Sequence, residues 1–424
     1  MKRWFFIVLI ACIAVNFSGC GKKEFQKSVI QNDMDMLEVS DIGVSDEDTQ
    51  PYWGTYIHTF AKAEGGYYYI GDWNTASFLL FFDEETQESY PVCGKADCNH
   101  ADDGCNAYVG REYSKGNNMA TFYLNSAVYY YKENLYLLDS MGYLVRFSPD
   151  GSQRERIALV SSLLEESGTN LVFHDDYVYV YSLLGHLGGE EEATETIKRY
   201  SLKDKSEEVV VEYTGKGAAI SAAKSYGDRL YFLIRTATVE RDEEKETVIV
   251  NESYNGLYAY EYQTGKAGKV LVANITDYCI NEETGDIYYY QYNDGLYNYN
   301  VKTKETKKLL DADESTRVAE ISFDGEYIYI DNRFWVSTAK RNSQLYYDTF
   351  CSVVSPDGTL INTIDCTGES FAFFGDEQYM FTEIFAQNEG KDTKIGFSGL
   401  GYIKKEDIKS GAECVWKKLE QEQE

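Results

Sequence analysis

Three cysteines and one histidine cluster in a short stretch of the chain. They are Cys93, Cys98, His100 and Cys105, which fit the spacing C-x4-C-x-H-x4-C within 13 residues. Three thiolates and one imidazole form a complete tetrahedral ligand set for Zn²⁺, so the stretch predicts a metal site. Because four protein ligands leave no open coordination position, we expect a structural ion rather than a catalytic one, and no other cofactor.

A disulfide is the alternative interpretation of the same cysteines. The start of the chain indicates an oxidising compartment, where a disulfide is chemically permitted. A disulfide would leave one of the three cysteines over and would not require His100, and unpaired thiols are a third interpretation. The scattered cysteines are expected to be buried small hydrophobic residues instead: Cys279, Cys351, Cys366 and Cys414.

Cys20 follows a segment with the features of a bacterial lipoprotein signal peptide. Lys2 and Arg3 form a basic start, and residues 4–15 form an apolar run too short to be a typical spanning helix. Residues 17–20, Phe-Ser-Gly-Cys, resemble a lipobox. We expect residues 1–19 to be removed and Cys20 to be acylated, with palmitate as one acyl group. The protein would then be a lipoprotein on the outer side of the cell membrane; a plain secretory signal with an incidental cysteine is the alternative.

The residues after Cys20 are acidic and poor in strand signals. Between Gln31 and Gln50 there are seven acidic residues, no basic residue and no aromatic residue. Such a composition favours a disordered, self-repelling spacer. We therefore expect a lipidated cysteine and tether over residues 20–51. A folded domain should follow over residues 52–424, with the Cys/His stretch in a loop insertion over residues 91–118.

The folded domain carries a repeated pattern of strands centred on tyrosine. Its clearest copy, residues 285–302, reads as two alternating strands joined by an Asp-Gly turn. Copies recur 41 to 67 residues apart, a period typical of propeller blades. We expect an all-β β-propeller with seven four-stranded blades, although six or eight blades also fit the pattern. The repeated tyrosines are expected at equivalent, buried places in their blades: Tyr136, Tyr179, Tyr231, Tyr288 and Tyr329.

The amino-acid composition of the chain indicates which classes of binding partner are excluded. The chain of 424 residues has 38 Tyr, 21 Phe and only 4 Pro, which suits a large β-rich core. Its formal net charge of −30 argues against nucleic acid and anionic membrane surfaces as direct partners. We expect a monomer that meets the membrane only through its N-terminal lipid.

Sequence motifs of familiar catalytic sites do not occur in the chain. Residues 396–400, Gly-Phe-Ser-Gly-Leu, lack the final glycine of a G-x-S-x-G elbow, and there is neither a phosphate-binding loop motif nor H-E-x-x-H. We therefore predict no catalytic residues and expect a non-enzymatic binding or scaffold module for a glycan, peptide or protein ligand. The alternative is a carbohydrate-active lyase or hydrolase with carboxylates or a His–Tyr pair at the channel mouth. His174 and His186 are expected to be structural or surface residues.

Several of these features occur together in one known family. The lipobox, the acidic spacer, the tyrosine repeats and residues 91–107 (Pro-Val-Cys…Cys-x-His…Cys-Asn-Ala) resemble the Tyr-rich β-propeller lipoproteins of Gram-positive gut bacteria, a family without an assigned activity. The resemblance covers the whole chain and is most specific in the Cys/His stretch. It implies a propeller fold and an extracytoplasmic location, and it implies no mechanism.

Overall fold

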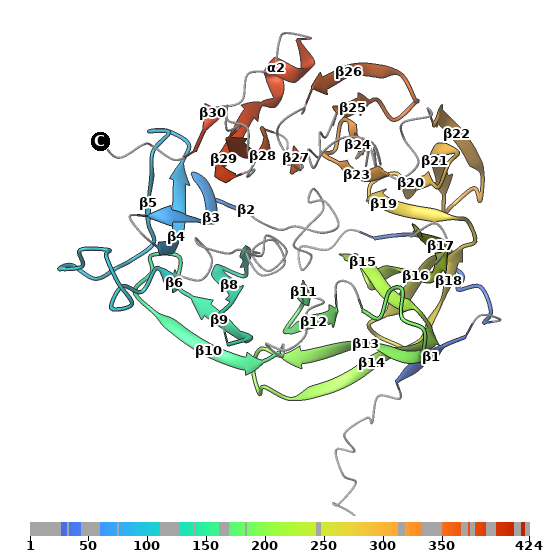
Figure 1. The fold of residues 1–424 in the computed structure, drawn as a ribbon, viewed down its shortest axis with the longest axis horizontal. Helices are drawn as coiled ribbons and strands as arrows, with labels where there is room; N and C mark the ends of the chain where they lie inside the picture. The colour runs from blue at the N-terminus through green and yellow to red at the C-terminus, as the bar shows by residue number, and fades with distance from the viewer. Residues whose placement is uncertain are drawn as a thin grey trace, which may run out of the picture.

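The computed structural model is a ring of seven β-sheets (Figure 1). This confirms the predicted all-β propeller, and the seven sheets are its blades. Among the described residues, no helix is long and apolar enough to cross a membrane. The structure describes residues 27–31, 34–43, 60–73, 76–110, 128–139, 141–160, 169–182, 185–242, 247–312, 319–332, 350–365, 372–373, 378–386, 396–410 and 417–419.

In each blade, consecutive strands pair antiparallel and their order runs from the middle of the ring to its rim (Figure 1). Blade 1 consists of β2 (Phe60–Ala63), β3 (Gly66–Trp73), β4 (Ala76–Asp83) and β5 (Ser89–Pro91), and β6 (Tyr108–Gly110) also pairs with β4. Blade 2 consists of β7 (Val128–Tyr131), β8 (Asn134–Leu138), β9 (Tyr143–Phe147) and β10 (Arg154–Leu159). Blade 3 consists of β11 (Thr169–His174), β12 (Tyr177–Ser182), β13 (Glu192–Ser201) and β14 (Glu207–Lys216). Blade 4 consists of β15 (Ala218–Tyr226), β16 (Arg229–Asp242), β17 (Thr247–Glu261) and β18 (Ala267–Leu271).

The remaining three blades repeat the same meander. Blade 5 consists of β19 (Ile275–Asn281), β20 (Asp286–Gln291), β21 (Gly295–Asn300) and β22 (Thr306–Asp311). Blade 6 consists of β23 (Ala319–Phe323), β24 (Ile328–Asn332), β25 (Phe350–Val354) and β26 (Leu360–Asp365). Blade 7 consists of β27 (Ala372–Phe373), β28 (Tyr379–Ala386), β29 (Gly396–Lys404) and β30 (Lys417–Lys418), with α2 (Lys405–Lys409) directly after β29.

The Gly-Leu-Tyr motif of the third strands has a steric cause. Gly295, the first residue of β21, has φ +134°, and a Cβ there would lie 2.0 Å from the carbonyl oxygen of Leu310 in β22. Gly256 in β17 has φ +100°, and its Cβ would lie 2.4 Å from the carbonyl oxygen of Leu271. Only glycine tolerates both the left-handed backbone and this approach of the rim strand, so the motif marks where the rim strand packs closest.

The repeated tyrosines occupy equivalent places, as predicted. All five lie in the second strand of their blades and are at most 3 % exposed. Their rings pack between blades: Tyr136 lies 4.9 Å from Phe173 of the next blade, and Tyr288 lies 5.4 Å from Phe323, measured between ring centroids. The tyrosine repeat therefore supplies the contact between neighbouring blades.

The ring is closed by aromatic packing between the last blade and the first. Phe381 of β28 stacks on Phe60 of β2 at a centroid distance of 4.1 Å, and Tyr67 of β3 meets Phe381 edge-on at 4.9 Å. Offset-stacked and edge-to-face pairs of this kind are worth about 0.5–1.5 kcal/mol beyond their buried area. Among the described strands, none is shared between the first and last blades.

A segment that precedes blade 1 also belongs to the folded ring. β1 (Ser28–Ile30) adds as a parallel strand to β14 at the rim of blade 3, and Met36 forms a parallel bridge with Lys269 of β18. The predicted disordered tether is therefore wrong for residues 27–31 and 34–43, which we call the strap. The rest of the predicted tether, Cys20 and the signal segment lie outside the described residues.

The strap is held by a few apolar side chains within its acidic sequence. Ile30, Val39 and Ile42 are at most 3 % exposed and pack in the clusters between blades 3, 4 and 5. Asp35 and Asp41 are exposed, so the acidic residues remain in water. Average composition indicated disorder because it hides this pattern of single buried residues.

Candidate functional site

The Cys/His loop lies between blades 1 and 2. It begins directly after β5 and ends at β6, and the backbone N–H of Val92 donates to the carbonyl of Leu79 at 2.9 Å. On the other side it meets the turn between β9 and β10. There the Asn106 side chain donates to the carbonyl of Gly151 at 2.8 Å, and Arg154 Nη1 donates to the carbonyl of Tyr108 at 2.8 Å. The loop therefore forms a bridge between two blades.

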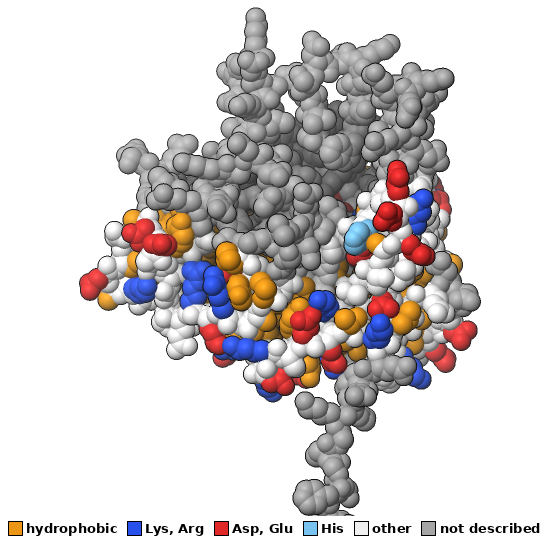
Figure 2. Space-filling view, turned by 60° about the horizontal axis from the view of Figure 1, so that its bottom comes forward, with side chains coloured by type: hydrophobic (Ala, Val, Ile, Leu, Met, Phe, Trp, Pro, Cys, Tyr) orange, Lys and Arg blue, Asp and Glu red, His pale blue; other side chains and the backbone are white. Residues whose placement is uncertain are grey.

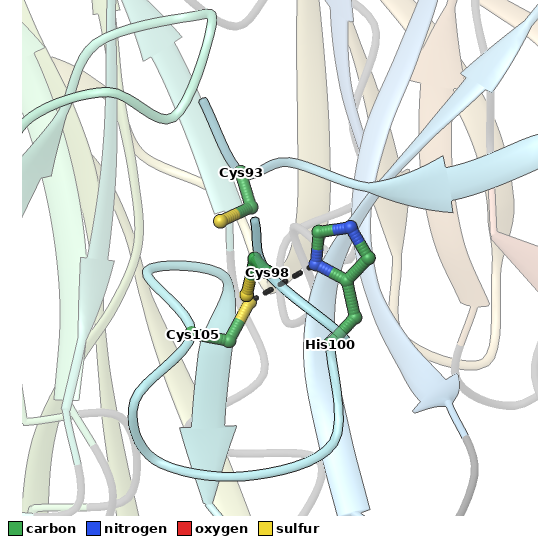
Figure 3. A group of neighbouring side chains, drawn as sticks. All are labelled: Cys93, Cys98, His100 and Cys105. Atoms are coloured by element: carbon green, nitrogen blue, oxygen red, sulfur yellow. Dashed lines mark hydrogen bonds between the residues drawn. The ribbon is translucent and has the colours of Figure 1, made fainter. Parts of the chain in front are cut away.

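The four predicted ligands converge in this loop. One ligand atom from each of Cys93, Cys98, His100 and Cys105 lies within 4.8 Å of the others, and His100 Nδ1 is 3.4 Å from Cys105 Sγ (Figure 3). A tetrahedral zinc ion with bond lengths of about 2.0–2.3 Å would need ligand atoms about 3.3–3.8 Å apart. His100 has φ +51°, a left-handed conformation that is uncommon for a residue with a side chain. The cluster can thus hold a thiophilic divalent cation after small side-chain movements.

Two thiols of the cluster differ in acidity. Burial raises the pKa of Cys93, but hydrogen bonds from the backbone at Lys95 and Asn106 and from the Cys105 and Cys98 thiols outweigh it, so its pKa is lowered overall. Burial raises the pKa of Cys105 to about 12, supported by the hydrogen bonds that this thiol gives to Cys93 and Cys98. Among the described cysteines none is in a disulfide. Cys279 and Cys351 are buried as predicted, whereas Cys366 and Cys414 lie outside the described residues.

A second site is a cavity between blades 3 and 4, with a volume of about 710 Å³. Its lining includes Asp175 of the turn between β11 and β12, and Gly227 and Asp228 of the turn between β15 and β16. The strap forms one of its walls. We call this cavity the cleft, and its lining residues are Ser40, Asp41, Ile42, Gly43, His174, Asp175, Tyr177, Tyr179, Arg199, Gly227, Asp228, Arg229, Tyr262 and Gln263.

Aromatic side chains form one part of the cleft. The His174 ring stacks on the Tyr262 ring with centroids 3.8 Å apart and planes 15° apart. Both groups meet the buried Ser225, whose Oγ is 2.6 Å from the Tyr262 hydroxyl and 3.3 Å from His174 Nδ1. The Arg199 guanidinium lies over the Tyr177 ring at 4.6 Å. These contacts hold the rings in fixed orientations, because each ring has a partner on at least one face.

The two arginines of the cleft are engaged in ion pairs. Arg199 pairs with Glu208, and Arg229 pairs with Asp228 at 2.5 Å and with Glu261 at 3.2 Å. Both guanidinium groups are largely buried, with side-chain exposures of 8 % and 12 %. Their charges are therefore compensated within the protein.

The carboxylates of the cleft are more exposed than the arginines, and each pairs with a basic side chain: Asp41 with Lys302, Asp175 with Lys132 and Asp228 with Arg229. The side chains of Asp41, Asp175 and Asp228 are 68 %, 57 % and 48 % exposed. Burial raises the pKa of the neighbouring Tyr179 despite the smaller opposing effect of Arg199, so its phenol stays protonated. The cleft therefore presents exposed, ion-paired carboxylates and neutral rings.

The rim that lies at the bottom of Figure 1 carries acidic and basic side chains interspersed with hydrophobic ones, and no continuous basic surface (Figure 2). Cross-strand ion pairs join such charges, as between Arg146 and Glu155 at 2.7 Å and between Lys198 and Glu207 at 2.9 Å.

The structure places the two histidines of blade 3 differently. His186 lies on the surface and its Nδ1 is 2.5 Å from Glu195 Oε1, in keeping with the expected structural role. His174 was not predicted to belong to a site, yet it lines the cleft. Its position directly before the turn between β11 and β12 is the only signal that could have indicated this, because such turns lie at one face of a propeller.

Comparisons with known proteins add little to these observations. No protein-family model matches the chain, and no curated protein matches its sequence significantly. The computationally designed Ika8 protein is 12 % identical with a TM-score of 0.38, covering 69 % of this chain and 96 % of its own. Sqt1 of Saccharomyces cerevisiae is 9 % identical with a TM-score of 0.37, covering 85 % and 96 %. An oligogalacturonate lyase in complex with manganese is 9 % identical with a TM-score of 0.31, covering 68 % and 87 %, and likenesses at this level carry no argument about function.

Proposed function

We propose that the protein is a lipid-anchored, extracytoplasmic propeller that binds a ligand without transforming it and acts as a monomer. The observation that carries this proposal is the cleft, a preformed cavity of about 710 Å³ with fixed aromatic rings and exposed polar groups. Cavities of about 300–1,000 Å³ are the usual size for small-ligand sites. Anchoring such a cavity outside the cell would present it to ligands of the surroundings.

Binding is favoured over catalysis by the state of the cleft's reactive groups. Ser225 is 7 % exposed and does not line the cleft, so its hydroxyl is poorly placed to attack a ligand. Arg199 and Arg229 are compensated by carboxylates, and Tyr179 is held neutral. A general base needs access to the proton that it removes, which these four groups lack, so catalysis would have to rest on His174 or on the exposed carboxylates of the cleft.

The anchor is supported by the sequence around Cys20 and by the position of the strap. The described residues begin at Lys27, seven residues after Cys20, so a lipid on Cys20 would lie at most about 25 Å along the chain from Lys27. The propeller would then be held close to the membrane surface rather than on a long spacer.

A structural zinc ion in the Cys/His loop completes the proposal. Cys93, Cys98, His100 and Cys105 would hold the ion, and the ion would fix the bridge between blades 1 and 2. Elemental analysis of protein purified without a metal-affinity tag tests this, with one zinc per chain as the expected result. His100→Ala should lower the zinc content, whereas metal-free protein with two of these cysteines in a disulfide would contradict the proposal.

The anchoring and binding functions are tested on the full chain. The wild-type protein should partition with membranes and the Cys20→Ala variant should not. Detergent-solubilised protein would then be screened against oligosaccharides, peptidoglycan fragments and peptides, with product analysis of every ligand bound. Binding without turnover is expected; membrane association of the Cys20→Ala variant, or turnover of a ligand, would overturn the corresponding half of the proposal.

One observation favours a second candidate function, a carbohydrate-active lyase or hydrolase. His174, Tyr262 and Ser225 form a hydrogen-bonded cluster at the cleft, and a histidine beside a tyrosine can serve as a base and acid pair. If this cluster is catalytic, His174→Ala should abolish turnover while ligand binding persists. Turnover that survives this variant would place any activity elsewhere.

A further inference from the structure

We propose that the cleft binds a neutral oligosaccharide and that the strap completes this binding site. The proposal rests on the proposed binding function and names its ligand class. It joins two observations, the chemistry of the cleft and the seating of Ser40–Gly43 as one of its walls.

Aromatic rings in the cleft suit the apolar faces of sugar rings. Tyr177 and Tyr262 are partly exposed, and one face of each ring is already covered, by Arg199 and by His174. A ring fixed in this way loses little conformational entropy when a ligand stacks against it. Tyrosine also combines an apolar ring with a hydroxyl that forms hydrogen bonds, as a polyhydroxylated ligand requires.

Polar groups around these rings match hydroxyl groups. Asp41, Asp175 and Asp228 offer carboxylate oxygens that accept hydrogen bonds, and Gln263 offers both a donor and an acceptor. All four side chains belong to exposed residues. A few polar groups around an aromatic surface are the usual means by which a pocket fixes the orientation of its ligand.

The charges of the cleft favour neutral saccharides over acidic ones as ligands. The two arginines of the cleft are already paired with Glu208, Asp228 and Glu261, so neither offers a spare positive charge to a uronate or sulfated sugar. The exposed Asp41 and Asp175 pair with Lys302 and Lys132, which lie outside the lining of the cleft. The net charge of −30 adds a long-range repulsion in the same direction. An acidic saccharide would therefore have to break existing ion pairs in order to bind.

A peptide fits the cleft less well than a saccharide. Extended peptides commonly add to a free sheet edge, but the rim strand β14 of blade 3 is already paired with β1. Peptides also use aliphatic anchor pockets, and the only aliphatic lining residue of the cleft, Ile42, is itself 1 % exposed. The described residues of the cleft therefore offer neither of these two modes of peptide recognition.

The strap is seated firmly enough to act as a wall. The Arg229 guanidinium donates to the carbonyl of Asp41 at 3.1 Å, and Ile42 packs in the cluster between blades 4 and 5. Gly227, with φ +59°, allows the carbonyl of Ile42 to approach so closely that a Cβ there would lie 2.2 Å away. Residues 40–43 therefore depend on contacts with blade 4, and losing these contacts would open one side of the cleft.

The ligand class is tested by calorimetric titration of the detergent-solubilised full chain. The probes are cellotetraose and tetra-N-acetylchitotetraose as neutral saccharides, and tetragalacturonate as an acidic one. We expect at least one neutral probe to bind, and the acidic probe to bind at least tenfold more weakly. Failure of both neutral probes, or tighter binding of tetragalacturonate, would overturn the proposal.

Cleft variants locate the site, each with a matched control. Tyr262→Ala should weaken the affinity for a neutral probe about tenfold, as expected for the loss of one stacked ring, whereas the exposed Tyr90→Ala on blade 1 should leave it unchanged. Asp175→Asn should weaken it several-fold, whereas Asp311→Asn on blade 5, 87 % exposed, should not. Equal effects of cleft and control variants would contradict the proposed site.

A strap variant tests the second half of the proposal. Ile42→Asp should release residues 40–43 and weaken saccharide binding about tenfold. The milder Ile42→Ala is the control for misfolding: it should weaken binding while its circular dichroism spectrum remains that of the wild type. Undiminished binding in both variants would show that the strap is no part of the site. If a peptide binds at the cleft instead, this inference fails while the proposed binding function stands; if a saccharide is hydrolysed there, the ligand class stands while the non-enzymatic function fails.

Discussion

Two segments outside the repeated blades are fastened to the ring by different means. In the Cys/His loop, four side chains that can bind a metal ion converge, and one ligand atom from each lies within 4.8 Å of the others. The strap has no such residues and is held by β-pairing with β14 and by the burial of Ile30, Val39 and Ile42. If the proposed ion is bound, the first fastening would depend on a few ligand atoms in addition to the hydrogen bonds of the loop to blades 1 and 2, whereas the second is spread along the segment.

This difference predicts different responses to perturbation. A metal centre fails when a single ligand is lost, because the remaining ligands no longer complete the tetrahedron. A segment held by distributed burial loses stability in proportion to the apolar surface that each change exposes. The following experiments separate these two behaviours.

The largest effect is expected from removal of a ligand of the Cys/His loop. Cys98→Ala should reduce zinc from about one per chain to nearly none and should abolish the protection of residues 92–107 against hydrogen exchange. The strap should keep its protection. Cys279→Ala, which removes a buried cysteine of blade 5, is the control and should retain the metal. Equal metal content in both variants would contradict a metal centre.

Sequence reasoning identified the loop and missed the strap for a physical reason. Cysteine and histidine are scarce, so four of them within 13 residues are conspicuous. Val39 and Ile42 are ordinary residues, and only their partners on blades 4 and 5 make them important. Composition averaged over Gln31 to Gln50 is acidic, and it conceals which single residues are buried.

The same distinction explains what could be predicted of the fold and of the cleft. The blades were predictable because alternation, glycine at the start of β21 and tyrosine in the second strands are all local signals. The cleft draws Ser40, His174, Arg199, Asp228 and Tyr262 from segments far apart in the sequence. The spacing of residues in the sequence does not predict such a site, because the site forms only when blades 3 and 4 lie side by side.

The next largest effect is expected in the strap. Ile42→Ala should lower the free energy of unfolding by about 2–4 kcal/mol, because it removes a fully buried aliphatic side chain. Denaturant titration measures this, and hydrogen exchange should increase in residues 28–43 but not in residues 92–107. Val29→Ala in β1 is the control within the strap, since Val29 is 46 % exposed, and it should cost less than about 0.5 kcal/mol. A larger loss in the control would mean that β-pairing rather than burial holds the strap.

Alkaline pH should weaken the packing next to both segments. Burial raises the pKa of Tyr289, in the cluster that holds the strap, to about 12, and burial raises the pKa of Tyr68, whose hydroxyl donates to the carbonyl of Pro149, to about 12. An unfolded tyrosine ionises near pH 10. The unfolded chain therefore loses protons first, and the stability present below pH 10 should decline as the pH rises towards 12.

Denaturant titrations between pH 8 and 11.5, with tyrosinate absorbance near 295 nm, measure this decline. Tyr289→Phe and Tyr68→Phe should each reduce its slope, because phenylalanine has no proton to lose. A decline that begins well below pH 10, or that is unaltered in both variants, would assign it to other groups.

The smallest effect is expected at the start of the strap. Lys27 Nζ lies 2.6 Å from Glu212 Oε2, with side-chain exposures of 48 % and 24 %. An ion pair this exposed contributes about 0–1 kcal/mol, because water screens it and because two long side chains lose freedom in forming it. Lys27→Ala should therefore lower the free energy of unfolding by less than about 1 kcal/mol, and the difference should shrink further at 1 M salt, where the screening length is about 3 Å.

Glu212→Gln provides the matched test of the same pair from the other side. It keeps the size of the side chain and removes its charge, so the two variants should have similar effects in low salt and neither should alter the exchange of residues 34–43. A loss above about 2 kcal/mol that persists in high salt would contradict the assignment of the strap's stability to burial. In that case the entry of the strap at Lys27, rather than the burial of Val39 and Ile42, would control whether the segment docks.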